Sequence, residues 1–166
     1  MPTWCIQVLS LALCLSSGFQ QGYIASVLNQ PYVQLQSFIN ESWIYRTGHP
    51  IEAATLDMMW SFLNICFPIS MIFGQFIAGY LCKRIGRKGA TILANAVCIP
   101  ATVLSAAAKP CFPAFELIYV ARILWALACG VSNVSATVWI IECAPPDIRG
   151  TVASMQEVFM ALGELE

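Results

Sequence analysis

Charged side chains gather in two short stretches of this sequence, and the chemistry they offer is electrostatic pairing. The first stretch, GYLCKRIGRKGA, holds half of the chain's 8 lysine and arginine residues: Lys83, Arg84, Arg87 and Lys88. The second stretch, ECAPPDIRG, opens with Glu142 and closes with Arg149 and a glycine. Acidic and basic groups beside apolar segments often pair simply to satisfy one another. A single such pair is therefore weak evidence of function.

Residues suited to enzymatic or metal chemistry are scarce. The lone His49 cannot form a zinc site or a Ser/His relay, so we expect no enzyme, no metal and no cofactor. The net charge of −1 provides no basic surface for a nucleic acid, and none is expected as a partner. The 8 cysteines show no CxxC pair, and we interpret them as small hydrophobic residues: Cys5, Cys14, Cys66, Cys82, Cys98, Cys111, Cys129 and Cys143.

Polar side chains interrupt two of the apolar segments. The first apolar segment carries three amides: Gln20, Gln21 and Asn29. A later segment carries a stripe of amide and hydroxyl groups: Ser132, Asn133, Ser135 and Thr137. Amides in a membrane helix either hydrogen-bond to neighbouring helices or line a solvated path. Several amides in one segment favour the path, and both interpretations stay open.

The composition indicates which elements position these groups. The chain has 166 residues, is 58% hydrophobic and 10% charged, and has a mean hydropathy of +0.71. A soluble domain carries about 25% charged residues, so lipid is the expected solvent. Spanning the hydrocarbon layer takes roughly 20 apolar residues, and only helices satisfy the backbone there. We expect an all-α membrane protein with four complete spans and part of a fifth: 5–28, 57–82, 89–108, 115–141 and 151–166.

The distribution of charge predicts the orientation of these spans. Basic turns remain in the cytoplasm, so the loops 83–88 and 143–150 are expected inside together with the N-terminus. The loops 29–56 and 109–114 are then extracellular. Asn40 begins an Asn-Glu-Ser tripeptide in the first of these loops and is an expected N-glycosylation site. Residues 1–18 also resemble a signal peptide, but no basic residue precedes their apolar run.

Small residues and one arginine complete the pattern within the spans. Small side chains recur at four-residue spacing in the second and fourth spans and predict close helix packing: Ser70, Gly74, Ala78, Ala126 and Gly130. Arg122 lies near the outer end of the fourth span. Because an unpaired arginine in lipid is costly, its side chain must reach the surface or find a partner within the bundle.

Together these stretches resemble the sugar transporter branch of the major facilitator superfamily, in particular the facilitative glucose and fructose transporters. GYLCKRIGRKGA is similar to the superfamily's cytoplasmic signature, and ECAPPDIRG to the Glu-x6-Arg-Gly pattern of sugar porters. GYIASVLNQPYVQLQSFINESW resembles the exit of the first span and the glycosylated loop. The matching positions include Gly22, Tyr23, Pro31, Trp43, Trp60, Phe62, Gly130 and Gly150.

The resemblance implies the N-terminal part of a six-helix bundle, from a carrier with two such bundles that transports a hexose by facilitated diffusion and alternating access. A sugar site needs amides and hydroxyls. The implied substrate path comprises Gln20, Gln21, Asn29, Asn133, Thr137 and Gln156. The implied cytoplasmic charge network, which would latch the two bundles, comprises Gly79, Arg84, Gly86, Arg87, Lys88, Glu142 and Arg149.

The resemblance also has departures. Lys83 replaces an acid or asparagine of the signature, and Thr137 and Trp139 replace a proline and a tyrosine. Ile24 stands where proton-coupled relatives carry aspartate, which favours uncoupled transport. Glu157 aligns with a sugar-binding glutamine, with Gln156 beside it, and this puts that contact in doubt.

Several alternatives remain open at this stage. The chain could be a truncated membrane protein that does not transport, or a carrier for another small solute. As a sugar carrier it is expected in the plasma membrane, with the bilayer, a sugar and an absent C-terminal bundle as partners. Residues 1–166 are not expected to transport alone. The sequence does not indicate which sugar is bound.

Overall fold

The chain is almost entirely helical in the part that the structure describes. A computed structural model describes residues 3–27, 31–108 and 115–165, and no strand occurs among them. The elements are α1 (Thr3–Leu13), the π-helix η1 (Cys14–Phe19), α2 (Gln20–Ser26), α3 (Tyr32–Thr47), α4 (Ala53–Arg84), α5 (Gly86–Ala107), α6 (Glu116–Cys143) and α7 (Arg149–Glu164).

Three of these helices, α4, α5 and α6, are long and apolar enough to cross a membrane. They have 32, 22 and 28 residues, whereas about 20 residues suffice for the hydrocarbon layer. The expected span 57–82 lies within α4, and 115–141 begins one residue before α6 and ends within it. The expected span 89–108 starts three residues after the beginning of α5 and ends one residue beyond its end. The basic turn is shorter than expected, because α4 continues to Arg84 and α5 begins at Gly86.

The expected first span is helical but not uniform. A π-helical segment of 6 residues, η1, joins α1 to α2. Ser17 lies within it and donates its hydroxyl to the carbonyl of Leu13 at 2.6 Å. Each π-turn accommodates an extra residue, which rotates the following side chains relative to a regular α-helix. The sequence analysis did not predict this π-helical segment, because its residues are equally compatible with an α-helix.

The segment between the first and second spans contains a helix that the sequence analysis did not foresee. Within 29–56, α3 covers 16 residues and ends in a C-cap at Gly48 with φ 75°. Glycine adopts this left-handed conformation without steric cost. Ile39, which is 1% exposed, packs inward. Polar composition alone does not distinguish such a helix from an ordered loop.

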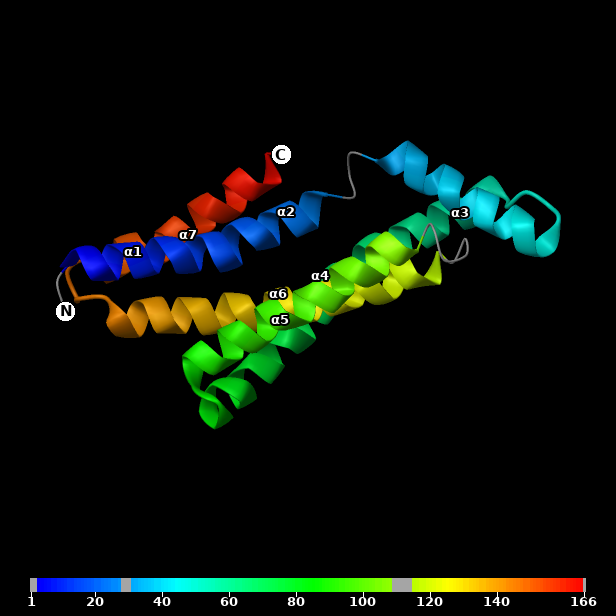
Figure 1. Cartoon of the computed structure of the whole chain (residues 1–166). Helices are drawn as coiled ribbons and strands as arrows, with labels where there is room; N and C mark the ends of the chain where they lie inside the picture. The colour runs from blue at the N-terminus through cyan, green and yellow to red at the C-terminus, as the bar shows by residue number, and fades with distance from the viewer. Residues whose placement is uncertain (1–2, 28–30, 109–114, 166) are drawn as a thin grey trace.

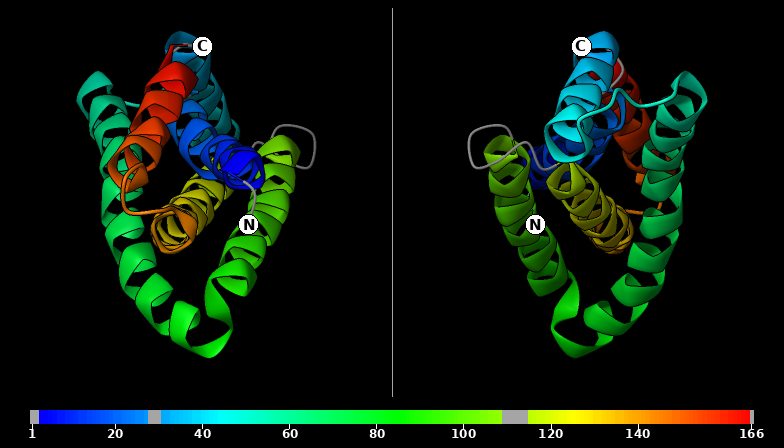
Figure 2. Two further views of the ribbon diagram at one scale, coloured as in Figure 1. Left: turned by 90° about the vertical axis from the view of Figure 1, so that its left-hand side faces the viewer. Right: turned by 90° about the vertical axis from the view of Figure 1, so that its right-hand side faces the viewer.

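The helices form a layered bundle. In Figure 1, α1, η1 and α2 form one rod, with α7 beside it, over α6. In the end-on views of Figure 2, α4 and α5 diverge from their common turn like a V, and α6 lies between the arms. The start of α1, the α4–α5 turn and the α6–α7 loop lie towards one end, and α3 lies at the other. This places the two charged stretches on the same side of the bundle.

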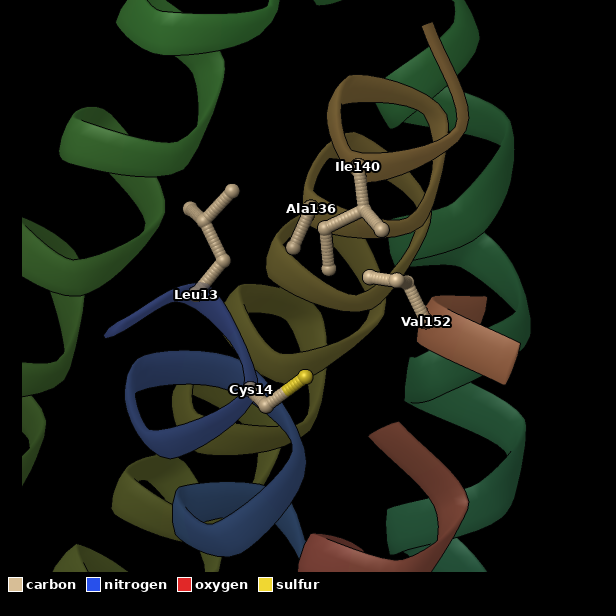
Figure 3. Close-up of a cluster of buried hydrophobic side chains, with 5 residues drawn as sticks. All are labelled: Leu13, Cys14, Ala136, Ile140 and Val152. Atoms are coloured by element: carbon tan, nitrogen blue, oxygen red, sulfur yellow. The ribbon is translucent and has the colours of Figure 1, made fainter. Parts of the chain in front are cut away.

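The core is organised around α6. In the most apolar stretch of α6, 50% of the residues are buried, whereas the share is 28% in the corresponding stretches of α4 and α5. All four buried apolar clusters of the described residues include side chains from α6. Figure 3 shows one of them, in which Leu13 and Cys14 meet Ala136 and Ile140 of α6 and Val152 of α7. The central helix thus holds the first and fifth expected spans together.

Glycines set the closest helix contacts. A Cβ on Gly74 of α4 would collide with the backbone carbonyl of Leu127, and one on Gly130 of α6 would collide with that of Met71. The small-residue spacing in these two spans therefore corresponds to close packing, as the sequence predicted. On the other side of α6, a Cβ on Gly22 would collide with the carbonyl of Met160. The first span accordingly lies backbone to backbone against α7.

Candidate functional site

A hydrogen-bonded polar layer connects α6 and α7. The Nε2 of Gln156 donates to the Oδ1 of Asn133, and the hydroxyl of Thr137 lies 2.7 Å from the Oε1 of Gln156. The same hydroxyl lies 2.8 Å from the Asn133 carbonyl. Gln156 is only 3% exposed, while Asn133 and Thr137 are half-buried. The structure thus brings together three of the six expected path residues.

The depth of this layer follows from helix geometry. At about 1.5 Å per residue, Asn133 lies about 15 Å from the Cys143 end of α6 and about 25 Å from the Glu116 end. A hydrocarbon layer about 30 Å thick, centred on α6, therefore contains Asn133. Amides at such a depth are costly unless they are bonded or solvated.

The two first-span glutamines have different surroundings. Gln21 is 3% exposed, and its Nε2 lies 3.7 Å from the sulfur of Met71 on α4. Its Oε1 is buried with no hydrogen-bond partner among the described residues. Gln20 is half-buried and lines a pocket beside Asn95, Cys98 and Thr102 of α5. The two described amides of the first span therefore face different helices, Gln21 towards α4 and Gln20 towards α5, and Asn29 lies outside the described residues.

Arg122 finds its partners inside the bundle. Its side chain is 2% exposed. The Nη1 donates to the carbonyl of Ile24, and Nη2 donates to the carbonyl of Ala25 at 3.2 Å. Its guanidinium carbon lies 4.4 Å from the centroid of the Phe67 ring. The last carbonyls of a helix have no intrahelical donor, so Arg122 caps the end of α2, and the alternative of a side chain reaching the surface is excluded.

An ion pair joins two members of the implied charge network, one from each charged stretch. The Nη2 of Arg87 lies 2.6 Å from the Oε1 of Glu142, with both side chains about half exposed. The first turn of α5 and the last turn of α6 are linked in this way. At the adjoining turn, Gly86 has φ 80°, a conformation that favours glycine.

The other expected members of the charge network are not joined to this pair. Arg84 lies over the ring of Tyr80 at 5.4 Å, and Arg149 donates to the carbonyl of Ala144 at 3.3 Å. Lys88 is exposed, and Gly79 has open space where a Cβ would project. The described residues therefore form one ion pair at this end of the bundle.

The opposite end has an ion pair that sequence reasoning missed. Arg46 of α3 binds Glu116, the first residue of α6, through two hydrogen bonds, with Nη2 3.0 Å from Oε2. The pKa of Arg46 is raised because its guanidinium donates to this carboxylate. Arg46 also lies 5.5 Å from the centroid of the Phe115 ring. The two residues are 70 positions apart, and no motif linked them.

The expected glycosylation site lies on α3. The Oδ1 of Asn40 accepts a hydrogen bond from the backbone of Ile51 at 3.1 Å, and Asn40 is half-buried. This bond uses the carboxamide oxygen, whereas a glycan attaches to the nitrogen.

No group of three or more potential metal ligands occurs among the described residues, and the described cysteines carry free thiols.

The long apolar helices, the buried polar layer and the sparse charges define a multi-pass helical membrane protein. Comparisons with known proteins identify its family. The chain belongs to the sugar (and other) transporter family of the major facilitator superfamily, whose family pattern matches residues 9–165.

Similar proteins include three named facilitated glucose transporters of solute carrier family 2. The chain is 33% identical to human member 11 over 160 residues, covering 95% of this chain and 32% of that protein. It is 33% identical to mouse member 7, covering 99% of this chain and 31% of that protein. It is 31% identical to human member 5, covering 98% of this chain and 32% of that protein. The chain thus spans about a third of the length of these relatives.

Among solved structures, the fold is similar to the xylose transporter XylE from E. coli in its inward-open conformation. The TM-score is 0.80, with 21% sequence identity, and the match covers 96% of this chain and 38% of the XylE chain. This likeness establishes the fold, that of a major facilitator superfamily bundle, as the sequence predicted.

Proposed function

We propose that this chain forms the N-terminal part of a carrier that moves a hexose across the plasma membrane by facilitated diffusion. The observation that supports this most is the polar layer of Gln156, Asn133 and Thr137. Sugars present many hydroxyl groups and no charge, and amides can both donate to and accept from them. The relatives named as facilitated glucose transporters support the same substrate class.

The expected path residues contribute in two ways under this proposal. Asn133, Thr137 and Gln156 form a bonded layer that positions amide groups beside the path. Gln20, Gln21 and Asn29 supply further amides from the first span. Ile24 offers no titratable group, which supports movement down a gradient without proton coupling.

The proposed orientation follows the charge distribution. The N-terminus, the α4–α5 turn and the loop before α7 face the cytoplasm, while α3 faces the outside with a glycan on Asn40. Because basic residues resist translocation, the Arg87 end of the bundle remains inside. Arg87 and Glu142 then form the core of a cytoplasmic latch, which Arg84, Lys88 and Arg149 complete with a second bundle.

Alternating access needs two bundles that move against one another. Residues 1–166 therefore do not transport by themselves in this proposal, and a C-terminal bundle is the required partner. Substrate is bound between the bundles and released as the cytoplasmic latch opens.

The test measures uptake of radiolabelled glucose and fructose into proteoliposomes. Residues 1–166 alone should give no uptake above protein-free liposomes, and the protein joined to a second bundle should equilibrate at least one hexose. In that protein, Gln156→Ala should raise KM, whereas Leu162→Ala, at an exposed apolar position of α7, should not. Transport of other solutes but neither hexose would favour the alternative carrier. No transport of any solute would favour a non-transporting membrane protein.

A further inference from the structure

Glu157 is an acidic residue at membrane depth that no described contact explains. It follows Gln156 directly in α7, so it lies at the level of Asn133, inside the hydrocarbon layer derived above. Its side chain is exposed. Within the described residues, neither of the two ion pairs involves it. A carboxylate at this depth must face water or a polar partner, because exposure to lipid is costly.

Helix geometry gives α7 three distinct faces. Val152, Gln156 and Gly163 are buried against the bundle. Successive residues are about 100° apart, so Glu157 lies beside this face and Val158 lies almost opposite it. Ser154, Glu157 and Glu164 form an exposed polar stripe, whereas Met155, Val158 and Leu162 form an exposed apolar stripe. The apolar stripe suits lipid and the polar stripe suits water.

We infer that Glu157 lines the solvated path and makes it acidic, so that the carrier accepts uncharged sugars and rejects sugars that carry a carboxylate. A carboxylate accepts hydrogen bonds from sugar hydroxyls but cannot donate any. Two like charges at close range repel strongly where water is partly excluded. The inference assigns a charge preference to the substrate site and rests on the proposed function.

The first experiment locates Glu157 without relying on transport. Glu157→Cys and Val158→Cys are compared in the full protein in cells, using a cationic, membrane-impermeant methanethiosulfonate reagent, with the unsubstituted protein as the blank. Only thiols in water form the reactive thiolate. We expect Cys at 157 to react roughly tenfold faster than Cys at 158. Equal reactivity, or no reaction at 157, would overturn the inference.

The second experiment measures selectivity. Uptake of glucuronate relative to glucose should rise about tenfold in Glu157→Gln, which removes the like-charge repulsion, and should stay low in Glu157→Asp. An unchanged ratio in Glu157→Gln would contradict the charge preference. Failure to transport glucose, with 157 still labelled, would reject the proposed hexose function but leave the assignment of Glu157 to the path. Glucose uptake without labelling at 157 would support the proposed hexose function and reject the assignment of Glu157 to the path.

Discussion

Arg87 at the start of α5 and Glu142 near the end of α6 form an ion pair across 2.6 Å, although 55 positions separate them in the chain. Both side chains are about half exposed. An exposed ion pair contributes only about 0–1 kcal/mol to stability. The pair is therefore better suited to bias a conformational equilibrium than to hold the bundle together.

We expect Glu142→Gln to change the free energy of unfolding by less than about 1 kcal/mol and yet to alter the rate of hexose uptake. Thermal unfolding in detergent and uptake in proteoliposomes measure the two effects. Asp147→Asn, at an exposed acid in the neighbouring loop, is the control and should change neither. A large loss of stability in Glu142→Gln would show that the pair is structural.

Arg122 offers the opposite case, a buried cation with a structural role. Arg122→Leu leaves the carbonyls of Ile24 and Ala25 without their donor, which should lower stability by about 1–3 kcal/mol. Arg46→Leu, which breaks the exposed pair with Glu116, should cost less. Thermal unfolding of the two variants gives the comparison. Equal stability of wild type and Arg122→Leu would contradict the capping role.

Close packing between α4 and α6 should make Gly74 intolerant of substitution. In Gly74→Ala the new methyl meets the backbone of Leu127, so the helices must separate, at a cost of about 1–3 kcal/mol. Gly79→Ala, on the same helix but with nothing within 4 Å, is the matched control. Its melting temperature should equal or exceed that of wild type, since alanine favours helix. Similar melting temperatures for the two variants would refute the packing argument.

Much of this architecture follows from hydrophobicity alone. Spans such as 57–82 and 115–141 are predominantly apolar, and in a bilayer only a helix satisfies their backbone. The sequence also indicated that Arg87 and Glu142 belong to one cytoplasmic group of charges, although it suggested Arg149 and not Arg87 as the partner of Glu142. Local composition determined these features, so one sequence sufficed.

Other features depended on tertiary contacts. Nothing local to Arg122 distinguished snorkelling from a buried cap, because the deciding carbonyls belong to α2. The pairing of Arg46 with Glu116 could not be predicted because it depends on where α3 lies, and the polar composition of that segment did not indicate a helix. Gln20 and Gln21 are adjacent in sequence, yet they face α5 and α4. Their surroundings follow from how the first span is oriented against its neighbours.

The proposed glycosylation of Asn40 gives a separate check on sidedness. Asn40→Gln should remove a single glycan, seen as a fall in apparent mass that matches the effect of a glycosidase on the wild type. The glutamine keeps a carboxamide oxygen that can accept from Ile51, so folding should be retained. An unchanged mass, with the protein at the cell surface, would show that Asn40 carries no glycan.

The orientation of the helices in the bilayer is tested most directly by labelling intact cells with an impermeant thiol reagent. Single cysteines are placed at Arg87 and at Asn40, in a background where the exposed Cys5 is replaced. We expect the probe at position 40 to be labelled from outside and the probe at position 87 to react only after permeabilisation. Labelling of 87 but not 40 in intact cells would reverse the topology and contradict the carrier assignment.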